Sequence, residues 1–291
     1  MPHRGKRPAG APAGRPGGGM EAARAREAES VAAVVYPAHA ARRPIIAHIP
    51  HSSREIPAHV RRGLRIDDAT LAAELLRLTD HHADRLFAWA GGLGATRFVA
   101  RYSRLVVDPE RFADDESEPM ARVGQGAVYT RTTEGRLLRR LGAGDRDALV
   151  ERYYAPYHRA LADLVSDDLA RTGECLVLDC HSFGSRLLPS EPDRSPDRPD
   201  ICIGTDRFHT PPELAERLRG AMAAEGFAVE LDRPFAGSLV PLRYYGVDGR
   251  VRSVMVEVRR GLYCDEATAE PLPCFEDVAG RIGRAVAGAL G

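Results

Sequence analysis

Cysteine is scarce in this sequence, and its spacing excludes several kinds of site. The chain of 291 residues has five cysteines, an odd number that cannot pair completely into disulfides. No two of them have the CxxC spacing of zinc ribbons or redox motifs. We therefore expect reduced thiols in a cytoplasmic protein. The five positions are Cys175, Cys180, Cys202, Cys264 and Cys274.

Long apolar runs and an excess of one charge are also missing. No run approaches the roughly 18 residues that cross a membrane. The first residues carry positive charge without the apolar stretch of a signal peptide. Lysine plus arginine equals aspartate plus glutamate, 41 of each, so the formal net charge is zero. This balance indicates neither a nucleic-acid partner nor a membrane surface, and the sequence does not indicate an oligomeric state.

The N-terminal segment differs in composition from the rest of the chain. Residues 1–29 consist largely of glycine, proline, alanine and arginine without an apolar period. Such a segment buries too little apolar surface to offset the entropy that folding removes. We therefore expect a disordered tail over 1–29 and a single folded α/β domain over 30–291.

Short apolar runs alternate with segments of helical spacing through the rest of the chain. The runs predict strands, and the spaced segments predict helices. This alternation is typical of a three-layer α/β/α fold with a mixed, largely parallel sheet. Residues 112–129 show no period and are expected to form a long loop over the site. Strands are predicted over 44–49, 95–107, 176–178, 200–204, 228–231 and 251–258, and helical regions over 66–90, 137–169, 212–225 and 275–290.

Four of the predicted strands end in polar residues that are capable of chemistry. In open α/β sheets, ligands bind at the carboxyl ends of the strands, so these residues are expected to meet at one edge. A break in the first helical region adds Asp80, and Glu55 follows four residues after the first histidine. The strand-end residues are His51, Asp108, Arg111, Asp179, His181 and Glu257.

These residue types match a metal-dependent hydrolase. Two histidines and one carboxylate from separate elements are the usual ligands of a catalytic zinc with one open position. A glutamate outside the ligand set then takes a proton from the metal-bound water. Glu257 lies among Met255, Val256 and Val258, so its carboxylate must be paired or have a raised pKa. Arginine binds carboxylates through two parallel hydrogen bonds. The sequence therefore indicates a hydrolase that uses one zinc, or another divalent ion, on a small acidic substrate.

The same residues allow other interpretations. The role of His51 could be limited to a hydrogen bond with the following turn. Arg111 could be an ordinary ion-pair residue. Ser182 beside His181 suggests a serine nucleophile, but the GxSxG turn that exposes such a serine is missing. Cys180 as a nucleophile would lie inside a strand and not at a helix N-terminus, where a thiolate is stabilised.

Nine short motifs resemble, in the same order, those of the N-formylglutamate amidohydrolases, the deformylases of histidine degradation. Each motif is weak by itself, but nine in order are specific at the level of the family. The resemblance begins near Pro44 and leaves the N-terminal tail outside. The motifs are IPHSS at 49–53, TDHHADRL at 79–86, YSRLVVDPERF at 102–112, PYH at 156–158, LDCHS at 178–182, PDICIGT at 199–205, RPFAGS at 233–238, LRYYG at 242–246 and VEVRRGLY at 256–263.

This resemblance implies a fold and a role for each matching position. The family is similar to the zinc carboxypeptidase and aspartoacylase group, which implies a carboxypeptidase-like α/β/α fold. His51 and His181 would be zinc ligands, and Glu257 would be the general base. Arg111 would bind a substrate carboxylate, with Arg243 as a second candidate for that role.

The third metal ligand falls where the chain departs from the carboxypeptidases. Those enzymes place a glutamate three residues after the first histidine, where this chain has Arg54. Asp80 fits the deformylase pattern and is the predicted third ligand, with Glu55 as the alternative. The family motif also favours asparagine or a similar residue at the position of Glu110 and a double glycine at Gly237-Ser238. Both departures lie near the expected substrate site.

We therefore expect a zinc-dependent hydrolase that removes an N-acyl group, predicted to be formyl, from an acidic amino acid. N-formylglutamate is such a substrate, and its products would be formate and glutamate. A carboxypeptidase-like hydrolase of peptides or cell-wall fragments is an alternative and would need an open groove. A non-catalytic binding protein of the same fold is another alternative and would not need a metal.

Overall fold

A seven-stranded mixed sheet forms the centre of the computed structural model, which describes residues 32–191 and 193–291. The tail predicted over 1–29 lies outside the described residues. β2, β3, β4 and β7 are parallel to one another, whereas β1 is antiparallel to β3 and the β5–β6 pair is antiparallel to β7. The strand order is β1-β3-β2-β4-β7-β5-β6, with β1 Ala33–Tyr36, β2 Ile45–Ile49, β3 Thr96–Ala100, β4 Cys175–Phe183, β5 Ile201–Gly204, β6 Val229–Leu231 and β7 Val251–Arg259.

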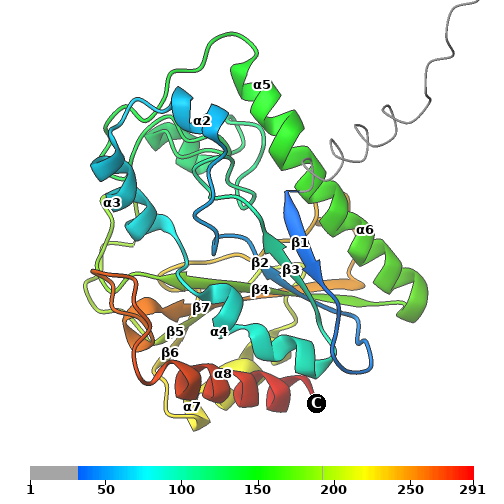
Figure 1. The fold of residues 1–291 in the computed structure, drawn as a ribbon. Helices are drawn as coiled ribbons and strands as arrows, with labels where there is room; N and C mark the ends of the chain where they lie inside the picture. The colour runs from blue at the N-terminus through cyan, green and yellow to red at the C-terminus, as the bar shows by residue number, and fades with distance from the viewer. Residues whose placement is uncertain (1–31, 192) are drawn as a thin grey trace, which may run out of the picture.

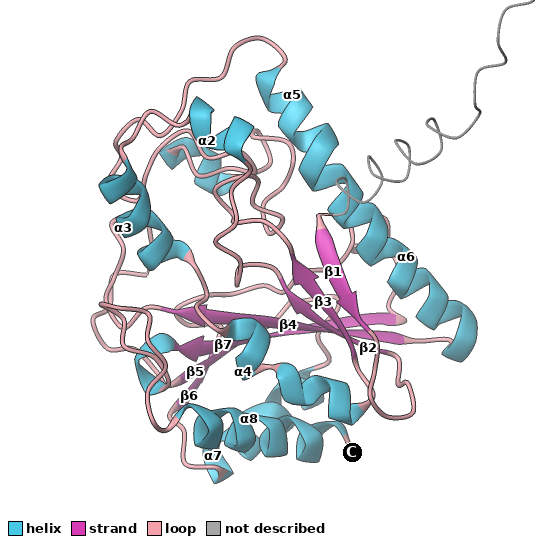
Figure 2. Cartoon of the chain, in the orientation of Figure 1, coloured by secondary structure: helices cyan, strands magenta, loops and turns pink. Residues whose placement is uncertain are grey.

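Helices cover both faces of the sheet, which gives the three layers predicted from the sequence (Figures 1 and 2). α6 packs on one face, and α4, α7 and α8 pack on the other. No helix in the described part of the chain is long and apolar enough to cross a membrane. The helices are α2 Ala58–Gly63, α3 Asp68–Leu78, α4 Ala83–Leu86, α5 Asp145–Leu149, α6 Ala155–Thr172, α7 Pro212–Ala224 and α8 Phe275–Leu290, with the shorter segments η1 Ala88–Leu93, η2 Pro119–Val123, η3 Val150–Tyr154 and η4 Arg260–Leu262.

The strands carry apolar side chains on both faces of the sheet, so both faces are buried. Ile45, Ala47 and Ile49 of β2 join the core beneath α7 and α8, whereas Ile46 joins the core beneath α6. Successive side chains of a strand point to opposite faces. His48 therefore lies on the α6 face, although its neighbours on both sides are apolar.

The segment after β3 was predicted as strand, and that prediction is wrong beyond Ala100. Residues 101–107 form bends and turns, yet Leu105 and Val106 are fully buried. Their apolar character reflects packing, Leu105 with leucines of α3 and Val106 with tyrosines of η3, rather than an extended backbone. The burial of apolar side chains can thus imitate a strand pattern.

The helical region predicted over 137–169 begins later than expected. Residues 137–144 are not helical, and α5 begins at Asp145 after Gly144, whose φ is 81°. A positive φ suits glycine because it has no Cβ. The backbone stays helical from α5 through η3 into α6, and Pro156 comes directly after the π-helical turn η3, where the hydrogen-bond ladder is already shifted. β1 and α2 are short and were not predicted.

Candidate metal and active site

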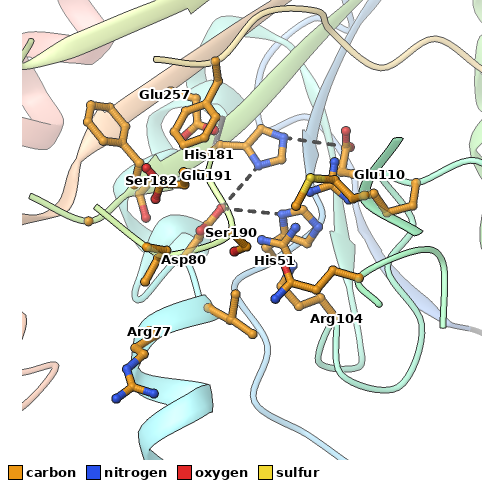
Figure 3. A pocket seen from close by; sticks show the side chains of 18 of the residues that line it. His51, Arg77, Asp80, Arg104, Glu110, His181, Ser182, Ser190, Glu191 and Glu257 are labelled. Atoms are coloured by element: carbon orange, nitrogen blue, oxygen red, sulfur yellow. Dashed lines mark hydrogen bonds and ion pairs between the residues drawn. The ribbon is translucent and has the colours of Figure 1, made fainter. Parts of the chain in front are cut away.

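The carboxyl ends of the parallel strands bring distant residues to one edge of the sheet (Figure 3). His51 follows β2, His181 lies near the end of β4, and Glu257 lies near the end of β7. His181 and Glu257 are register partners, so their side chains share a face of the sheet. Asp80 comes from the break between α3 and α4, and its backbone N–H donates to the His51 carbonyl at 3.0 Å. That bond fixes the break against the end of β2.

His51, Asp80 and His181 form a compact cluster of buried candidate ligands. One ligand atom from each lies within 4.8 Å of the others. Asp80 Oδ2 is 3.3 Å from His181 Nδ1 and 3.9 Å from His51 Nδ1. Ligands of tetrahedral zinc are roughly 3.3–3.6 Å apart, because each bond is about 2.0–2.2 Å. His51 Nδ1 is buried and has no hydrogen-bond partner among the described residues. The cluster therefore fits a divalent metal ion in both donor chemistry and spacing.

A carboxylate behind each histidine fixes the direction of its ring. His51 Nε2 lies 2.8 Å from Asp108 Oδ1, and His181 Nε2 lies 2.9 Å from Asp179 Oδ1. An ionised carboxylate only accepts hydrogen bonds, so each Nε2 donates. Nδ1 of His51 is then left without a proton, whereas Nδ1 of His181 donates to Asp80 at 3.3 Å and would give up that proton to a metal. Metal-binding histidines commonly have such partners. Both aspartates stand at predicted strand ends, but no role was predicted for them.

The electrostatics of the cluster follow from burial and from close opposite charges. Burial, with the charge of Arg104, lowers the pKa of His51 to about 4. Burial by itself would raise the pKa of Asp80, but the hydrogen bond from His181 and the nearby cations bring it to about 2. A neutral His51 and an ionised Asp80 are the forms that bind metals. Burial by itself would lower the pKa of His181, but the neighbouring carboxylates of Asp179 and Asp80 outweigh burial and raise this pKa well above its usual value. A metal would therefore have to displace a proton from His181.

Glu257 is a buried carboxyl group beside this cluster. Its side chain lines the main cavity, yet the residue is only 8% exposed. Its Oε2 has no hydrogen-bond partner in the described part of the chain. Burial raises the pKa of Glu257 to about 7, against the attraction of His181. A carboxyl group with this pKa can accept and return a proton near neutral pH.

The cluster opens into a cavity of about 420 Å³. The long loop predicted over 112–129 contributes Phe112, Met120 and Gln125 to its wall, as expected. A second cavity, of about 220 Å³, shares Glu110, Arg111 and Phe112 with the first. Arg111 therefore borders both cavities, and its side chain is 27% exposed.

Two of the sequence-predicted candidates lie away from the cluster. Glu55 is exposed and does not line either cavity. Arg243 is exposed as well, and its guanidinium donates to the Ala162 carbonyl at 2.9 Å and to the Tyr244 hydroxyl at 2.6 Å. The structure thus brings together Asp80 and the two histidines, with Arg111 at the cavity wall, but does not bring Glu55 or Arg243 to them.

The alternative nucleophiles are poorly placed for attack. The Cys180 side chain belongs to the core on the α7 and α8 face, and burial together with Asp179 raises the pKa of its thiol well above the usual value. Ser182 Oγ accepts a hydrogen bond from Arg260 Nε at 3.4 Å, and among the described residues it makes no hydrogen bond to a histidine or carboxylate that could serve as a general base. Neither residue has the activated environment of a covalent catalyst.

Sequence reasoning missed His48 and gave no role to Arg104 or Arg260. Arg104 binds Asp108 through two nitrogens, and Arg260 lies 3.6 Å from Asp80. His48 could have been noticed as a polar residue inside an apolar strand. The two arginines carry no comparable signal, because charged residues outside the apolar runs are usually on the surface.

An α/β sheet that presents imidazoles and carboxylates at one edge, beside a buried glutamate, defines a protein of the hydrolase class. The chain matches the model of the N-formylglutamate amidohydrolases over residues 43–264. It belongs to this family and is an amidohydrolase that acts on a linear amide.

Curated relatives and solved structures agree with this assignment. The chain is 32% identical over 230 residues to an N-formylglutamate deformylase of Pseudomonas aeruginosa, which covers 77% of this chain and 83% of the relative. It is 30% identical over 248 residues to an N-formylglutamate deformylase of Pseudomonas putida, covering 83% and 88%. The crystal structure of an N-formylglutamate amidohydrolase from Ralstonia eutropha superposes with a TM-score of 0.77 at 23% identity, over 89% of this chain and 98% of that one. This last similarity supports the fold alone.

Proposed function

We propose that the protein is a zinc-dependent deformylase that hydrolyses N-formyl-L-glutamate to formate and glutamate. The convergence of His51, Asp80 and His181, with Nδ1 of each histidine directed to one point beside Glu257, carries this proposal. The names of the curated relatives support the choice of substrate. The five free cysteines and the family resemblance agree with a cytoplasmic enzyme of histidine degradation.

Nδ1 of His51, Nδ1 of His181 and one oxygen of Asp80 would hold the metal. A bound zinc would act as a Lewis acid on the formyl carbonyl and lower the pKa of a water molecule. The chain's own residues must then bind the substrate and move protons.

Glu257 is the proposed general base and acid. Its Oε2 lacks a partner among the described residues and borders the cavity. In the forward reaction it takes a proton from the attacking water while the new C–O bond forms. It then donates that proton to the leaving nitrogen as the C–N bond breaks, and glutamate leaves as the free amine.

Arg111 is the proposed site for a carboxylate of the substrate. Its Nε is buried without a hydrogen-bond partner among the described residues, and it lies 3.7 Å from Asp108 Oδ2. Guanidinium groups bind carboxylates with fixed, bidentate geometry. With the formyl group near the histidine cluster, the amino-acid part of the substrate would extend past Arg111 into the second cavity.

Metal analysis combined with a substrate panel tests this proposal. The purified full-length protein should contain one zinc per chain and show its highest kcat/KM for N-formyl-L-glutamate. The panel should include N-formyl-L-aspartate, N-acetyl-L-glutamate and a γ-glutamyl dipeptide. Preference for the dipeptide would favour the peptidase alternative. A protein that neither binds metal nor turns over any substrate would favour the binding-protein alternative.

A further inference from the structure

A buried chain of hydrogen bonds continues behind His181 and reaches α6, the helix that covers this face of the sheet. Asp179 Oδ1 lies 2.9 Å from His181 Nε2 and 2.8 Å from His48 Nδ1. His48 Nε2 in turn lies 2.6 Å from the hydroxyl of Tyr157. His48 and Asp179 are fully buried, and Tyr157 is 2% exposed. The chain therefore joins β4 to β2 and β2 to α6 without contact with solvent.

The sheet register places these groups in line. His48 and Asp179 are register partners in β2 and β4, and Asp179 and His181 are two residues apart, so all three point to the α6 face. Tyr157 lies in the first turn of α6, above His48. The fold therefore holds the groups at hydrogen-bonding distance through its backbone geometry.

The partners in this chain determine where each proton resides. Asp179 Oδ1 can only accept, so both His181 Nε2 and His48 Nδ1 donate to it. Asp179 Oδ2 accepts the backbone N–H of Leu239 at 2.9 Å. A His48 ring that donates through Nδ1 accepts through Nε2, and the Tyr157 hydroxyl therefore donates. Every polar atom in the chain then has a partner.

The same atoms could be taken for a second metal site. One ligand atom each from His48, Glu110 and Asp179 lies within 4.8 Å of the others. A cation there would displace the hydrogen bond between His48 and Asp179 and weaken the support of His181. His48 and Asp179 have a hydrogen-bond partner at each polar side-chain atom, which favours a supporting role for these two residues, whereas the buried Oε1 of Glu110 has no partner in the described part of the chain.

We propose that His48 and Tyr157 are positioning residues of the metal centre, acting through Asp179 to hold Nδ1 of His181 toward Asp80. This inference rests on the metal site proposed above. Outer partners that orient a metal-binding histidine typically change metal affinity when they are removed. His48 and Tyr157 are the next two members of the hydrogen-bond chain beyond Asp179, so they support His181 indirectly.

The two ligand histidines differ in how strongly they are supported. Asp108, behind His51, also binds Arg104 through two nitrogens, the hydroxyl of Tyr129 and the backbone N–H of Glu110. Within the described chain, Asp179 has no guanidinium partner. The orientation of Asp179 therefore depends on His48 and the Leu239 amide. Loss of His48 should thus loosen the orientation of the His181 ring.

Zinc affinity, measured by competition with a chromogenic chelator, tests the inference. His48→Leu should lower the affinity about 10- to 100-fold. Tyr157→Phe should lower it about 2- to 10-fold, as expected for one neutral hydrogen bond. His48→Asn retains an amide donor near the position of Nδ1 and should have an affinity between those of the parent and His48→Leu.

Tyr153→Phe is a matched control. Tyr153 is also 2% exposed, and its hydroxyl lies 2.9 Å from Nε2 of another histidine, His59. Within the described part of the chain neither residue hydrogen-bonds Asp179, so this variant should keep the parent's zinc affinity even if its metal-free form melts earlier. Melting of every metal-free variant should be recorded, because a purely structural role would lower stability without changing zinc affinity.

The outcomes separate this inference from the proposed function. If the parent binds zinc and His48→Leu and Tyr157→Phe bind it as tightly as Tyr153→Phe does, the inference is wrong and the proposed function stands. If the parent does not bind zinc, both are wrong. If His48→Leu does not fold, Tyr157→Phe and His48→Asn decide the question, because both retain most of the buried volume.

Discussion

His181 on β4 and Glu257 on β7 lie directly opposite each other in a parallel ladder. Neighbouring strands are about 4.8 Å apart, so the backbone determines the spacing between a candidate ligand and the candidate base. A slip of one residue between these strands would turn one of the two side chains to the opposite face. The ladder therefore makes this part of the site rigid before any substrate binds.

Glu257→Gln is expected to lower kcat about 10²- to 10⁴-fold, the usual contribution of a general base. Glutamine keeps the size of the side chain but cannot accept the proton. Zinc content and melting temperature should stay close to those of the parent protein. Near-normal turnover of N-formyl-L-glutamate would show that another group moves the proton.

Arg111→Met is expected to raise KM for N-formyl-L-glutamate about 10- to 100-fold, because hydrogen bonds to charged groups contribute about 1.5–3 kcal/mol. The methionine keeps much of the apolar stem and removes the charge. Arg243→Met is the matched control, since Arg243 is exposed and lines neither cavity. Steady-state kinetics of both variants would distinguish the two arginines, and an equal effect would contradict the assignment to Arg111.

Removal of the metal by a chelator is expected to abolish turnover and to lower the melting temperature. A ligand that binds only the folded state stabilises it by about 4 kcal/mol at a thousand times its dissociation constant. Added zinc should restore both properties in the parent but not in a His51→Ala, His181→Ala double variant. Full activity of a metal-free preparation would exclude the proposed metal centre.

His158 is expected to make stability depend on pH. Burial, with a smaller effect of His48, lowers the pKa of His158 from 6.5 to about 4. As the pH falls through 6.5, His158 becomes protonated in the unfolded chain. In the folded chain it stays neutral until the pH is near 4. This contribution to stability is therefore complete above pH 6.5 and declines, by up to roughly 3 kcal/mol, toward pH 4.

His158→Gln provides the comparison for this pH dependence. The variant lacks the titrating group but keeps a polar side chain of similar size. Urea unfolding of both proteins at pH 7, 5.5 and 4.5 should show a difference in unfolding free energy that shifts against the parent as the pH falls. A difference that does not change with pH would contradict the expected shift.

Much of the sheet could be predicted because its strands are buried on both faces. The apolar runs in β2, β4 and β7 stand out in the sequence, and polar residues follow them where the strands end. Residues 101–107 were mistaken for a strand because apolar side chains in buried turns give a similar pattern. Hydrophobicity reports burial, and only in regular elements does it also report backbone conformation.

The histidines of the site could be predicted from their place at the strand ends, but their supporting partners could not. Asp108 meets His51, and Tyr157 meets His48 across 109 positions of sequence. Such pairings depend on register and on the placement of α6, which a single sequence does not specify. His48 was hidden inside an apolar run, where its polarity was the one available signal.

The candidate ligands and Glu257 come from positions 51, 80, 181 and 257, so no fragment shorter than this span contains them all. They approach one another only when β2, β4 and β7 have paired. An unfolded or truncated chain would offer zinc scattered side chains and hold it weakly. Zinc that stays bound to the protein through gel filtration would therefore indicate, during purification, that the molecules are correctly folded.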